Sequence, residues 1–327
     1  MFETALSLIG GLILLFAGGE LLVRGAVQVA TRLGVSPLVI GLTLVGFGTS
    51  APELVTSVQA ALIGSPGIAY GNIVGSNIAN ILLILGASAL LAPIVVSSGA
   101  LKRDSVFMVA VAVVFAAAAA LMQLGVLVGV LFIAALAFYV FTAFRQERQH
   151  AAGGHGAAYD KSIAAQGVDP AFIPEEKPER SVVISLLVAL AGLGLVVFGG
   201  FLLVEGAVTL ARSLGVSETV IGLTIVAVGT SMPELVTSIM ASIRKQADVA
   251  FGNIVGSNIY NILGIGGFTA VTAPSVVPLG IVRFDNVVMI AASILLVVVA
   301  YTGRRISRPE GGLLVALYIG YVAWLWP

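Results

Sequence analysis

The sequence contains no cysteine and little charge: only 10% of its 327 residues are Asp, Glu, Lys or Arg. Without cysteine the chain has no disulfide framework, no thiolate metal site and no redox motif. Basic and acidic residues number 16 each, so no excess of either sign points to nucleic acid or to an acidic partner. Both histidines lie in one polar stretch, 145–180, which leaves every apolar segment without histidine.

Apolar residues fill most of the rest. They make up 59% of the chain and give a mean hydropathy of +1.10, well above the composition of a soluble domain. Apolar runs of about 20 residues recur from end to end, long enough to cross a membrane as helices, whereas the alternating strands of a membrane β-barrel are not seen. The first run follows Glu3 rather than a basic segment and precedes no cleavage site, so we expect it to be retained. The sequence predicts an all-α integral membrane protein.

Ten apolar segments qualify as membrane-spanning helices. They lie at 5–30, 36–63, 68–92, 105–122, 125–144, 181–210, 217–242, 248–273, 286–302 and 311–326. We predict a first five-helix repeat over 1–144, a linker loop over 145–180 and a second five-helix repeat over 181–327. The linker is rich in Gly, Ala and charge, which cannot build a core, so we expect it to be flexible. A metal site or pH sensor at His150 and His155 is the alternative to a solvated loop.

The two halves repeat each other at an offset of 181 residues. "GVSPLVIGLTLVGFGTS" (34–50) matches "GVSETVIGLTIVAVGTS" (215–231) at 12 of 17 positions, and 51–80 matches 232–261 at 17 of 30 positions without a gap. Because each half has an odd number of spans, the second half starts on the opposite side of the membrane. The repeats are therefore inverted, an arrangement that many secondary transporters use to build a midplane site between two halves.

Basic residues are distributed unequally between the two predicted faces. Arg212 and Arg283 are the only Lys or Arg on one face, whereas the face that includes the linker carries 13. By the positive-inside rule we expect the linker to be cytoplasmic and both termini to lie outside. We predict a multi-pass protein of the cell (inner) membrane.

Each half carries the same two polar motifs on consecutive spans. The first is "GTSAPE" (48–53) with its partner "GTSMPE" (229–234), and the second is "GNIVGSNIAN" (71–80) with its partner "GNIVGSNIYN" (252–261). Proline has no N–H for the carbonyl four residues earlier, so each first motif should kink its helix and free a backbone oxygen in mid-membrane. Such an oxygen needs a partner in lipid, and a bound cation is one.

The side chains of these motifs supply only hard oxygen ligands. Thr49 and Glu53 share a helix face, as do Ser76 and Asn80, because the members of each pair are four residues apart. Without histidine or thiol in any span, the motifs suit Na⁺ or Ca²⁺ rather than zinc or copper. The two carboxylates of Glu53 and Glu234 can balance one Ca²⁺ or two or more Na⁺, but not both sets of ions at once. Exchange requires that binding of one ion excludes the other in this way. An intramembrane carboxylate is a functional candidate by default.

Other polar residues of the spans have structural explanations. Hydroxyls such as those of Thr56 and Ser57 commonly bond their own helix backbone. Glu20 and Arg24 are four residues apart and either pair or snorkel. Four asparagines of the second motif are open between interhelix hydrogen bonding and ion contact: Asn72, Asn77, Asn253 and Asn258.

The four motifs, in this order and spacing, resemble the alpha-1 and alpha-2 repeats of the Ca²⁺/cation antiporter superfamily, and its prokaryotic Na⁺/Ca²⁺ exchanger branch in particular. The resemblance covers nearly the whole chain. It implies the exchanger fold and a transporter, not an enzyme, which exchanges Na⁺ for Ca²⁺ electrogenically by alternating access. The first and sixth spans would slide across a more rigid core. It also implies that the protein needs no cofactor and that its ligands are the transported Ca²⁺ and Na⁺. Its surroundings would be the lipid bilayer, with no nucleic acid as partner, and it would function as a monomer.

The resemblance further implies roles for individual residues. Glu53 and Glu234 would be central ligands shared by both ions, and Thr49 and Thr230 would give backbone carbonyls to Ca²⁺. Flanking Na⁺ sites would use Ser50, Ser76, Ser231 and Ser257, completed by backbone oxygens near Gly46 and Ala227, where glycine at 46 replaces the expected alanine. Asn80 and Asn261 would occupy the remaining central positions. Some K⁺-dependent relatives carry aspartate in place of Asn261, so we predict no K⁺ requirement here.

Other functions fit the residues less well. A Ca²⁺/H⁺ antiporter could use the same two glutamates as proton carriers, because burial raises the pKa of a carboxyl group. The hydroxyl-rich flanks of the motifs favour Na⁺, which needs extra oxygens that a proton does not. A passive cation channel would gain nothing from a cage with two carboxylates, and an intramembrane hydrolase lacks a His or Lys placed to activate a serine.

Overall fold

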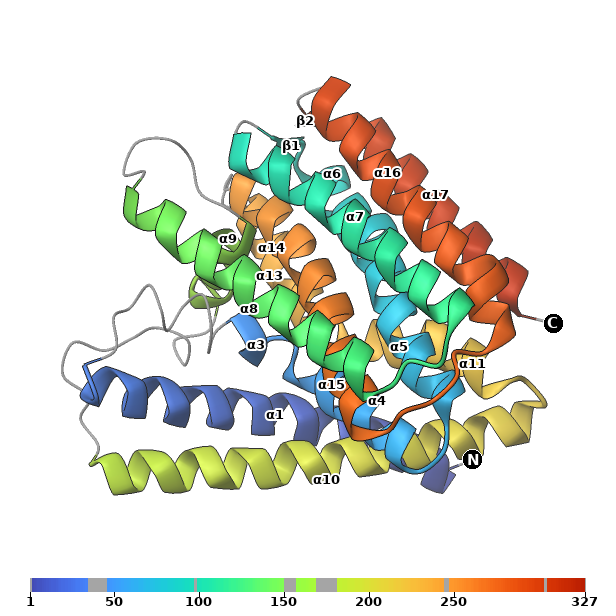
Figure 1. Ribbon diagram of the computed structural model, residues 1–327. Helices are drawn as coiled ribbons and strands as arrows, with labels where there is room; N and C mark the ends of the chain where they lie inside the picture. The colour runs from blue at the N-terminus through green and yellow to red at the C-terminus, as the bar shows by residue number, and fades with distance from the viewer. Residues whose placement is uncertain are drawn as a thin grey trace.

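Long helices make up nearly all of the structure (Figure 1), a computed structural model that describes residues 2–34, 46–96, 99–149, 157–168, 181–243, 247–302 and 305–326. The elements up to the linker are α1 (Phe2–Arg32), α3 (Gly46–Gly48), α4 (Ala51–Leu62), α5 (Pro66–Ala79), the π-helix η2 (Asn80–Leu85), α6 (Gly86–Leu91), β1 (Ile94–Val95), α7 (Gly99–Leu121) and α8 (Val126–Gln149). The linker contains α9 (Ala157–Gln166).

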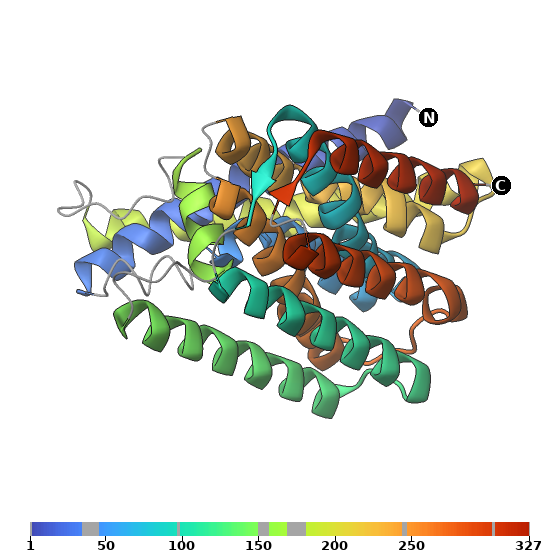
Figure 2. The same cartoon turned by 90° about the horizontal axis from the view of Figure 1, so that it is seen from above.

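The long helices of the second half follow the same order, whereas its strand lies one span later in the half. Its elements are α10 (Val182–Leu214), α11 (Glu218–Ile221), η4 (Gly222–Val226), α12 (Ala227–Thr230), α13 (Met232–Ile243), α14 (Ala247–Ile259), η5 (Tyr260–Ile265), α15 (Gly266–Thr272), η6 (Ile281–Asp285), α16 (Asn286–Thr302), β2 (Arg305–Ile306) and α17 (Arg308–Leu325). The strands β1 and β2 pair antiparallel and so tie the two halves together, as Figure 2 shows from above.

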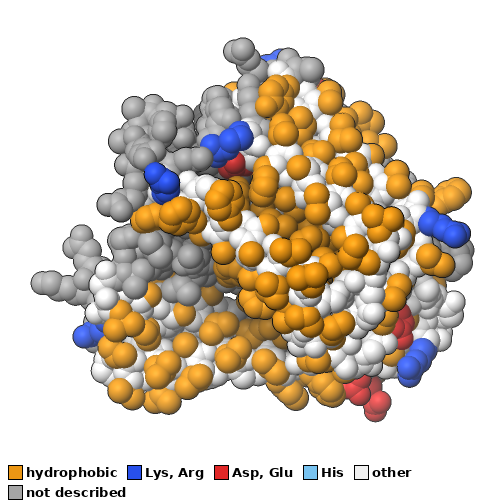
Figure 3. All heavy atoms as spheres, viewed as in Figure 1, with side chains coloured by type: hydrophobic (Ala, Val, Ile, Leu, Met, Phe, Trp, Pro, Cys, Tyr) orange, Lys and Arg blue, Asp and Glu red, His pale blue; other side chains and the backbone are white. Residues whose placement is uncertain are grey.

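The predicted all-α membrane architecture is confirmed. Among the described residues, seven continuous helices are long and apolar enough to cross a membrane, and the bent segment from Glu218 to Ile243 makes an eighth. The other two predicted spans correspond to α17 and to α3 with α4, although residues 36–45 of the second span lie outside the described residues. Apolar side chains cover most of the face in Figure 3, while charged side chains lie at its margins, as a lipid-embedded surface requires.

Local sequence signals explain where several helices end. The side chain of Ser181 accepts a hydrogen bond from the N–H of Ile184 at the start of α10, and Gly215 ends that helix with a left-handed backbone (φ 68°). At α17, Ser307 and Glu310 form a capping box. These caps satisfy backbone groups that would otherwise be costly at the membrane interface.

Helices α1 and α10, the first of each half, pack along their whole length as an antiparallel pair (Figure 1). Glycines occur at seven-residue intervals on both: Gly11, Gly18 and Gly25 on α1, and Gly192, Gly199 and Gly206 on α10. A Cβ added to Gly18 would lie 2.7 Å from the backbone nitrogen of Val196, and one added to Gly199 would lie 2.8 Å from the carbonyl oxygen of Gly11. Equivalent helices thus run in opposite directions at a backbone-to-backbone seam, which is the geometry of inverted repeats.

The spans that carry the second polar motif are the most buried. In the most apolar stretch of the helix from Pro66 to Leu91, 83% of the residues are buried, and in that of the helix from Val249 to Thr272 the share is 89%. The corresponding share for α10 is 22%. Since these two helices are enclosed by the others, their asparagines and serines face protein rather than lipid. The third and eighth spans therefore form the interior against which the broken spans pack.

The linker is not flexible throughout, so that prediction is wrong for residues 157–168. Helix α9 packs against α14, and its Lys161, Ala164 and Ala165 are buried. The run 157–166 is the longest in the linker without Gly or Pro, which allows a short helix, and alanine lets that helix pack closely. His150 and His155 lie outside the described residues.

The glycine seam leads to a prediction about stability. Gly192→Ala should destabilise the protein by about 1–3 kcal/mol, because its Cβ would collide with the backbone of Leu22 and force α1 away. Gly194→Ala is the matched control on the same helix, since an added Cβ there meets nothing within 4 Å. Thermal unfolding of the two purified variants measures the difference. Equal unfolding midpoints would show that the seam tolerates a side chain.

Candidate cation site

Both spans that carry the first polar motif are broken where the prolines predict. In the second half the segments Glu218–Thr230 and Met232–Ile243 meet at 49°. In the first half, α3 ends at Gly48 and α4 begins at Ala51, with proline in its first turn. The predicted kinks are confirmed. Each break places a glutamate, Glu53 or Glu234, in the first turn of a new helix, where the helix dipole favours negative charge.

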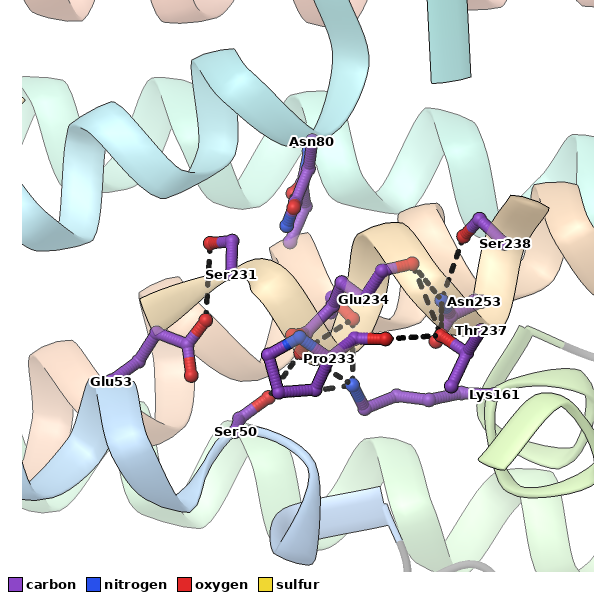
Figure 4. Close-up of polar contacts among 12 residues, drawn as sticks. Ser50, Glu53, Asn80, Lys161, Ser231, Pro233, Glu234, Thr237, Ser238 and Asn253 are labelled. Atoms are coloured by element: carbon purple, nitrogen blue, oxygen red, sulfur yellow. Dashed lines mark hydrogen bonds and ion pairs between the residues drawn. The ribbon is translucent and has the colours of Figure 1, made fainter. Parts of the chain in front are cut away.

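The two glutamates are linked to each other's repeat by serines. Ser50 Oγ donates to Glu234 Oε1 at 3.2 Å, and Ser231 Oγ donates to Glu53 Oε1 at 3.1 Å. All four side chains are at most 2% exposed. Figure 4 shows the glutamates entering the same interior region from α4 and α13. The two breaks therefore build one shared site and not two separate ones.

Several oxygens of this site have no hydrogen-bond partner among the described residues. They are Oε2 of Glu53 and of Glu234, Oγ1 of Thr49, and Oδ1 of Asn80 and of Asn261. Buried polar atoms are normally satisfied, and buried carboxylates need charge compensation as well. These are the hard oxygen donors that bind Na⁺ and Ca²⁺, so the residues fit a cation as ligand. Within the described part of the chain, no cluster of three or more His, Asp or Glu side chains exists that would add a third carboxylate.

Asparagines of the second motif hold the broken spans in place. Asn72 Nδ2 donates to the carbonyl oxygen of Glu53 at 3.2 Å and to Ser57 Oγ at 2.9 Å. In the other repeat, Asn253 Nδ2 donates to the carbonyl oxygen of Glu234 at 3.3 Å and to Ser238 Oγ at 2.8 Å. Each asparagine thus fixes the backbone of its own glutamate.

Two further asparagines, Asn80 and Asn258, join the two halves. Asn80 Nδ2 donates to Asn258 Oδ1 at 2.9 Å, and Asn258 Nδ2 donates to the carbonyl oxygen of Asn77 at 3.3 Å. The question left open for Asn72, Asn77, Asn253 and Asn258 is thereby answered in part, because all four take part in structural hydrogen bonds.

π-helical turns begin beside the central asparagines. η2 starts at Asn80, and η5 starts at Tyr260, one residue before Asn261. A π-turn rotates side chains relative to a regular helix and occurs often at functional sites. Nothing in the residue pattern predicts these turns.

Several hydroxyls that the resemblance assigns to the ions lie close to other polar groups of the site. Ser76 Oγ is 3.4 Å from the carbonyl oxygen of Ala227, and Thr230 Oγ1 is 3.0 Å from Asn72 Oδ1. Ser257 Oγ is 3.4 Å from Glu234 Oε1. For Gly46, the counterpart of Ala227, the structure gives only the backbone position at the start of α3.

Lys161 is the residue that sequence reasoning missed. Its side chain is fully buried, and its Nζ donates to Ser257 Oγ at 2.6 Å and lies 3.3 Å from both Ser50 Oγ and Glu234 Oε1. Figure 4 shows it reaching the glutamate from α9. The only signal in the sequence is the Gly- and Pro-free run around it, which predicts a short helix but not where that helix packs.

A cavity of about 530 Å³ lies beside the site, between α1, α4, α13 and α9. Thr49 and Pro52 line it from one repeat, Pro233 and Thr237 from the other. Glu20 lines it from α1 and forms the expected pair with Arg24, at 2.8 Å. The cavity therefore lies between α1 and the broken spans.

Comparisons with known proteins agree with this geometry. The family model described as sodium/calcium exchanger protein matches residues 4–145 and 184–326. The putative antiporter CaxA of Alkalimonas amylolytica is 36% identical over 98% of each chain, and the sodium/calcium exchanger MaX1 of Methanosarcina acetivorans is 34% identical over 97% of each. A solved structure of the sodium-calcium exchanger NCX_Mj, soaked with 2.5 mM Na⁺ and 1 mM Sr²⁺, aligns with TM-score 0.63 and 32% identity over 99% of this chain and 98% of that one.

Many secondary transporters have inverted repeats around a midplane site. The matching family and structural neighbours are exchangers, so this chain is a transporter and not an enzyme. The chain belongs to the sodium/calcium exchanger family and has its fold of ten membrane helices in two inverted repeats.

The asparagine bonds lead to a second prediction. Asn253→Ala should lower stability by about 1–3 kcal/mol, because the carbonyl of Glu234 and two hydroxyls lose their buried donor. It should also weaken Ca²⁺ binding, since Glu234 is no longer fixed.

Thr272→Ala is the control, because its exposed hydroxyl donates only to the carbonyl of Phe268 in its own helix. Thermal unfolding with and without Ca²⁺ measures both effects. An Asn253→Ala protein as stable as the control would rule out the structural role of this asparagine.

Proposed function

We propose that the chain exchanges Na⁺ for Ca²⁺ across the membrane by alternating access, through one cation site between Glu53 and Glu234. The observation that carries this proposal is the pair of buried glutamates from equivalent positions of the two repeats, each with an oxygen unpartnered among the described residues. Two buried negative charges are compensated by one Ca²⁺ or by Na⁺ ions in the same space. Because both loads need the same carboxylates, loading one ion displaces the other.

The site geometry and the family support the following roles for individual residues. Glu53 and Glu234 serve both ions, with Asn80 and Asn261 beside them. Thr49 and Thr230 give backbone carbonyls to Ca²⁺ next to the helix breaks. Na⁺ takes flanking positions at Ser50, Ser76, Ser231 and Ser257, completed by the carbonyls of Gly46 and Ala227. The distance of 3.4 Å between Ser76 Oγ and the Ala227 carbonyl oxygen supports one of these positions.

Two further properties follow from the charge of the site. Flanking hydroxyl positions beyond the two carboxylates allow more than two Na⁺ for each Ca²⁺, so exchange is electrogenic. Asparagine at 261 leaves two carboxylates in place of three, so the site needs no K⁺. The first property depends on the number of oxygen positions for Na⁺, and the second depends on the number of carboxylates.

The alternating step uses the pair α1 and α10. These helices pack chiefly on each other through the glycine seam, and the cavity separates α1 from the breaks in the core. Because α1 and α10 pack closely on each other through these glycines, the two helices can move as one unit past α4 and α13. Access to the site then passes from one side of the membrane to the other without movement of the ligands.

The chain is a membrane protein, and we place it in the cell (inner) membrane with the linker in the cytoplasm and both termini outside. The excess of 13 basic residues over two supports this orientation. We also infer the division into repeats 1–144 and 181–327 around the linker 145–180, and function as a monomer, since one chain holds both halves of the site.

The proposal predicts the behaviour of reconstituted protein. In proteoliposomes loaded with Na⁺, ⁴⁵Ca²⁺ uptake should follow the outward Na⁺ gradient, and Glu53→Gln or Glu234→Gln should reduce it about 100-fold or more. Loss of one partner of a buried charge contact costs about 2–5 kcal/mol. Glu205→Gln is the control, because that glutamate is exposed on α10. Uptake by either Gln variant at the control rate would contradict the proposed site.

The same vesicles decide the coupling ion. Uptake should persist when the pH is equal on both sides and should be unchanged when K⁺, equal on both sides, replaces choline. Uptake driven by a pH gradient in the absence of Na⁺ would favour a Ca²⁺/H⁺ antiporter with the same glutamates. Dependence on K⁺ at fixed Na⁺ would contradict the inference from Asn261.

A further inference from the structure

Helix α9 of the linker is seated on the membrane core through close contacts. It packs on α14 where that helix has Gly252, and a Cβ added to Gly252 would collide with the side chain of Asp160. Ala164 and Ala165 are buried at 3% and 1% exposure. A helix that rested loosely on the surface would require neither a glycine opposite it nor buried alanines.

This seat carries Lys161 into the cation site. Its ammonium has three oxygen neighbours: Ser257 Oγ at 2.6 Å, with Ser50 Oγ and Glu234 Oε1 both at 3.3 Å. The Nζ also lies 5.9 Å from the ring centroid of Tyr260, within reach of a cation–π contact. All three oxygens belong to residues that we assign to the transported ions.

A lysine in this position takes the place of an ion. A buried ammonium needs oxygen neighbours and a negative charge, as a bound Na⁺ does, and the site gives it both. A cation that entered while Lys161 remained would share Ser50, Ser257 and Glu234 with a like charge in a water-poor interior, where repulsion is strong. The seated lysine and a fully loaded site therefore exclude each other.

We propose that the cation site also binds a primary ammonium, that of Lys161, as a tethered competitor of the transported ions. This inference rests on the proposed function. With Lys161 seated, the linker keeps the site from being fully loaded and so from transporting, and Ca²⁺ or Na⁺ binding displaces α9 from α14. A tethered group competes at an effective concentration that can reach the millimolar range. The linker thus sets the cation level at which exchange begins.

Competition has a specific kinetic signature. Removal of the ammonium should lower the Ca²⁺ concentration for half-maximal binding and uptake, by about tenfold if the ion contact is worth 1.4 kcal/mol. It should leave the maximal rate unchanged, because saturating Ca²⁺ displaces the lysine in the wild-type protein as well. A lysine that only stabilises the fold would change thermal stability or maximal rate, not the half-saturating concentration.

The first test compares Lys161→Ala with Lys177→Ala, which removes the same charge elsewhere in the linker. Equilibrium ⁴⁵Ca²⁺ binding to purified full-length protein and initial uptake rates in Na⁺-loaded proteoliposomes are measured over a range of Ca²⁺. We expect about tenfold tighter binding for Lys161→Ala and wild-type values for Lys177→Ala. Gly252→Ala, which disturbs the seat of α9 without a change of charge, should match Lys161→Ala.

The second test restores the charge chemically. Because the chain has no cysteine, Lys161→Cys can be modified at one position. Aminoethyl methanethiosulfonate adds an ammonium through a mixed disulfide, whereas methyl methanethiosulfonate adds a neutral group, and mass spectrometry checks the extent of each reaction. The ammonium adduct should return half-saturating Ca²⁺ toward the wild-type value, and the neutral adduct should not.

The outcomes separate this inference from the proposed function. Equal half-saturating Ca²⁺ in wild type, Lys161→Ala and both adducts would overturn the tethered competitor while Na⁺-dependent uptake still supports exchange. No Na⁺-dependent uptake in wild type and in Lys161→Ala alike would overturn the proposed function. Tighter Ca²⁺ binding after loss of the ammonium would nevertheless support Lys161 as a competitor for the site.

Discussion

The charge of two carboxylates inside a membrane protein is the constraint on which the rest of the structure depends. Glu53 and Glu234 are each 1% exposed, and each has one oxygen bonded to a serine of the other repeat and one without a partner in the described chain. A buried charge of this kind persists only with a compensating cation. In the structure, the ammonium of Lys161 lies beside Glu234, and the proposed transported ions would compensate both carboxylates. A carrier that moves only with compensated charge would couple the movement of one ion to that of the other.

The surrounding structure holds the two glutamates in place. Proline breaks set each carboxylate at the start of a helix, and Asn72 and Asn253 bind the backbone of those same residues. The glycine seam joins α1 and α10, which carry neither of the two polar motifs. In the proposed mechanism, the ligands stay fixed while α1 and α10 move, and each of the two repeats contributes one helix to this pair and one glutamate to the site.

Much of this arrangement could be predicted from the sequence, because duplication and apolar length are one-dimensional signals. The repeat offset predicts that equivalent helices run antiparallel, and the prolines predict the bend of 49° in the second half. Other features depend on contacts between distant segments. The π-turns at Asn80 and Tyr260 have no signal in the residue pattern, and the Gly- and Ala-rich composition of the linker does not show that α9 packs on the core. The position of Lys161 could not be predicted, since a lysine in a polar linker is ordinarily solvated.

Competition at equilibrium tests most directly whether one site serves both ions. Purified protein is held at a fixed ⁴⁵Ca²⁺ concentration while Na⁺ is raised at constant ionic strength, and bound Ca²⁺ and ²²Na⁺ are counted in parallel. A shared cage predicts that bound Ca²⁺ falls to background along a curve steeper than a single-ion isotherm, with more than one Na⁺ bound for each Ca²⁺ released. Ca²⁺ that stays bound when Na⁺ is saturating would mean separate sites, and would contradict exchange through the pair Glu53 and Glu234.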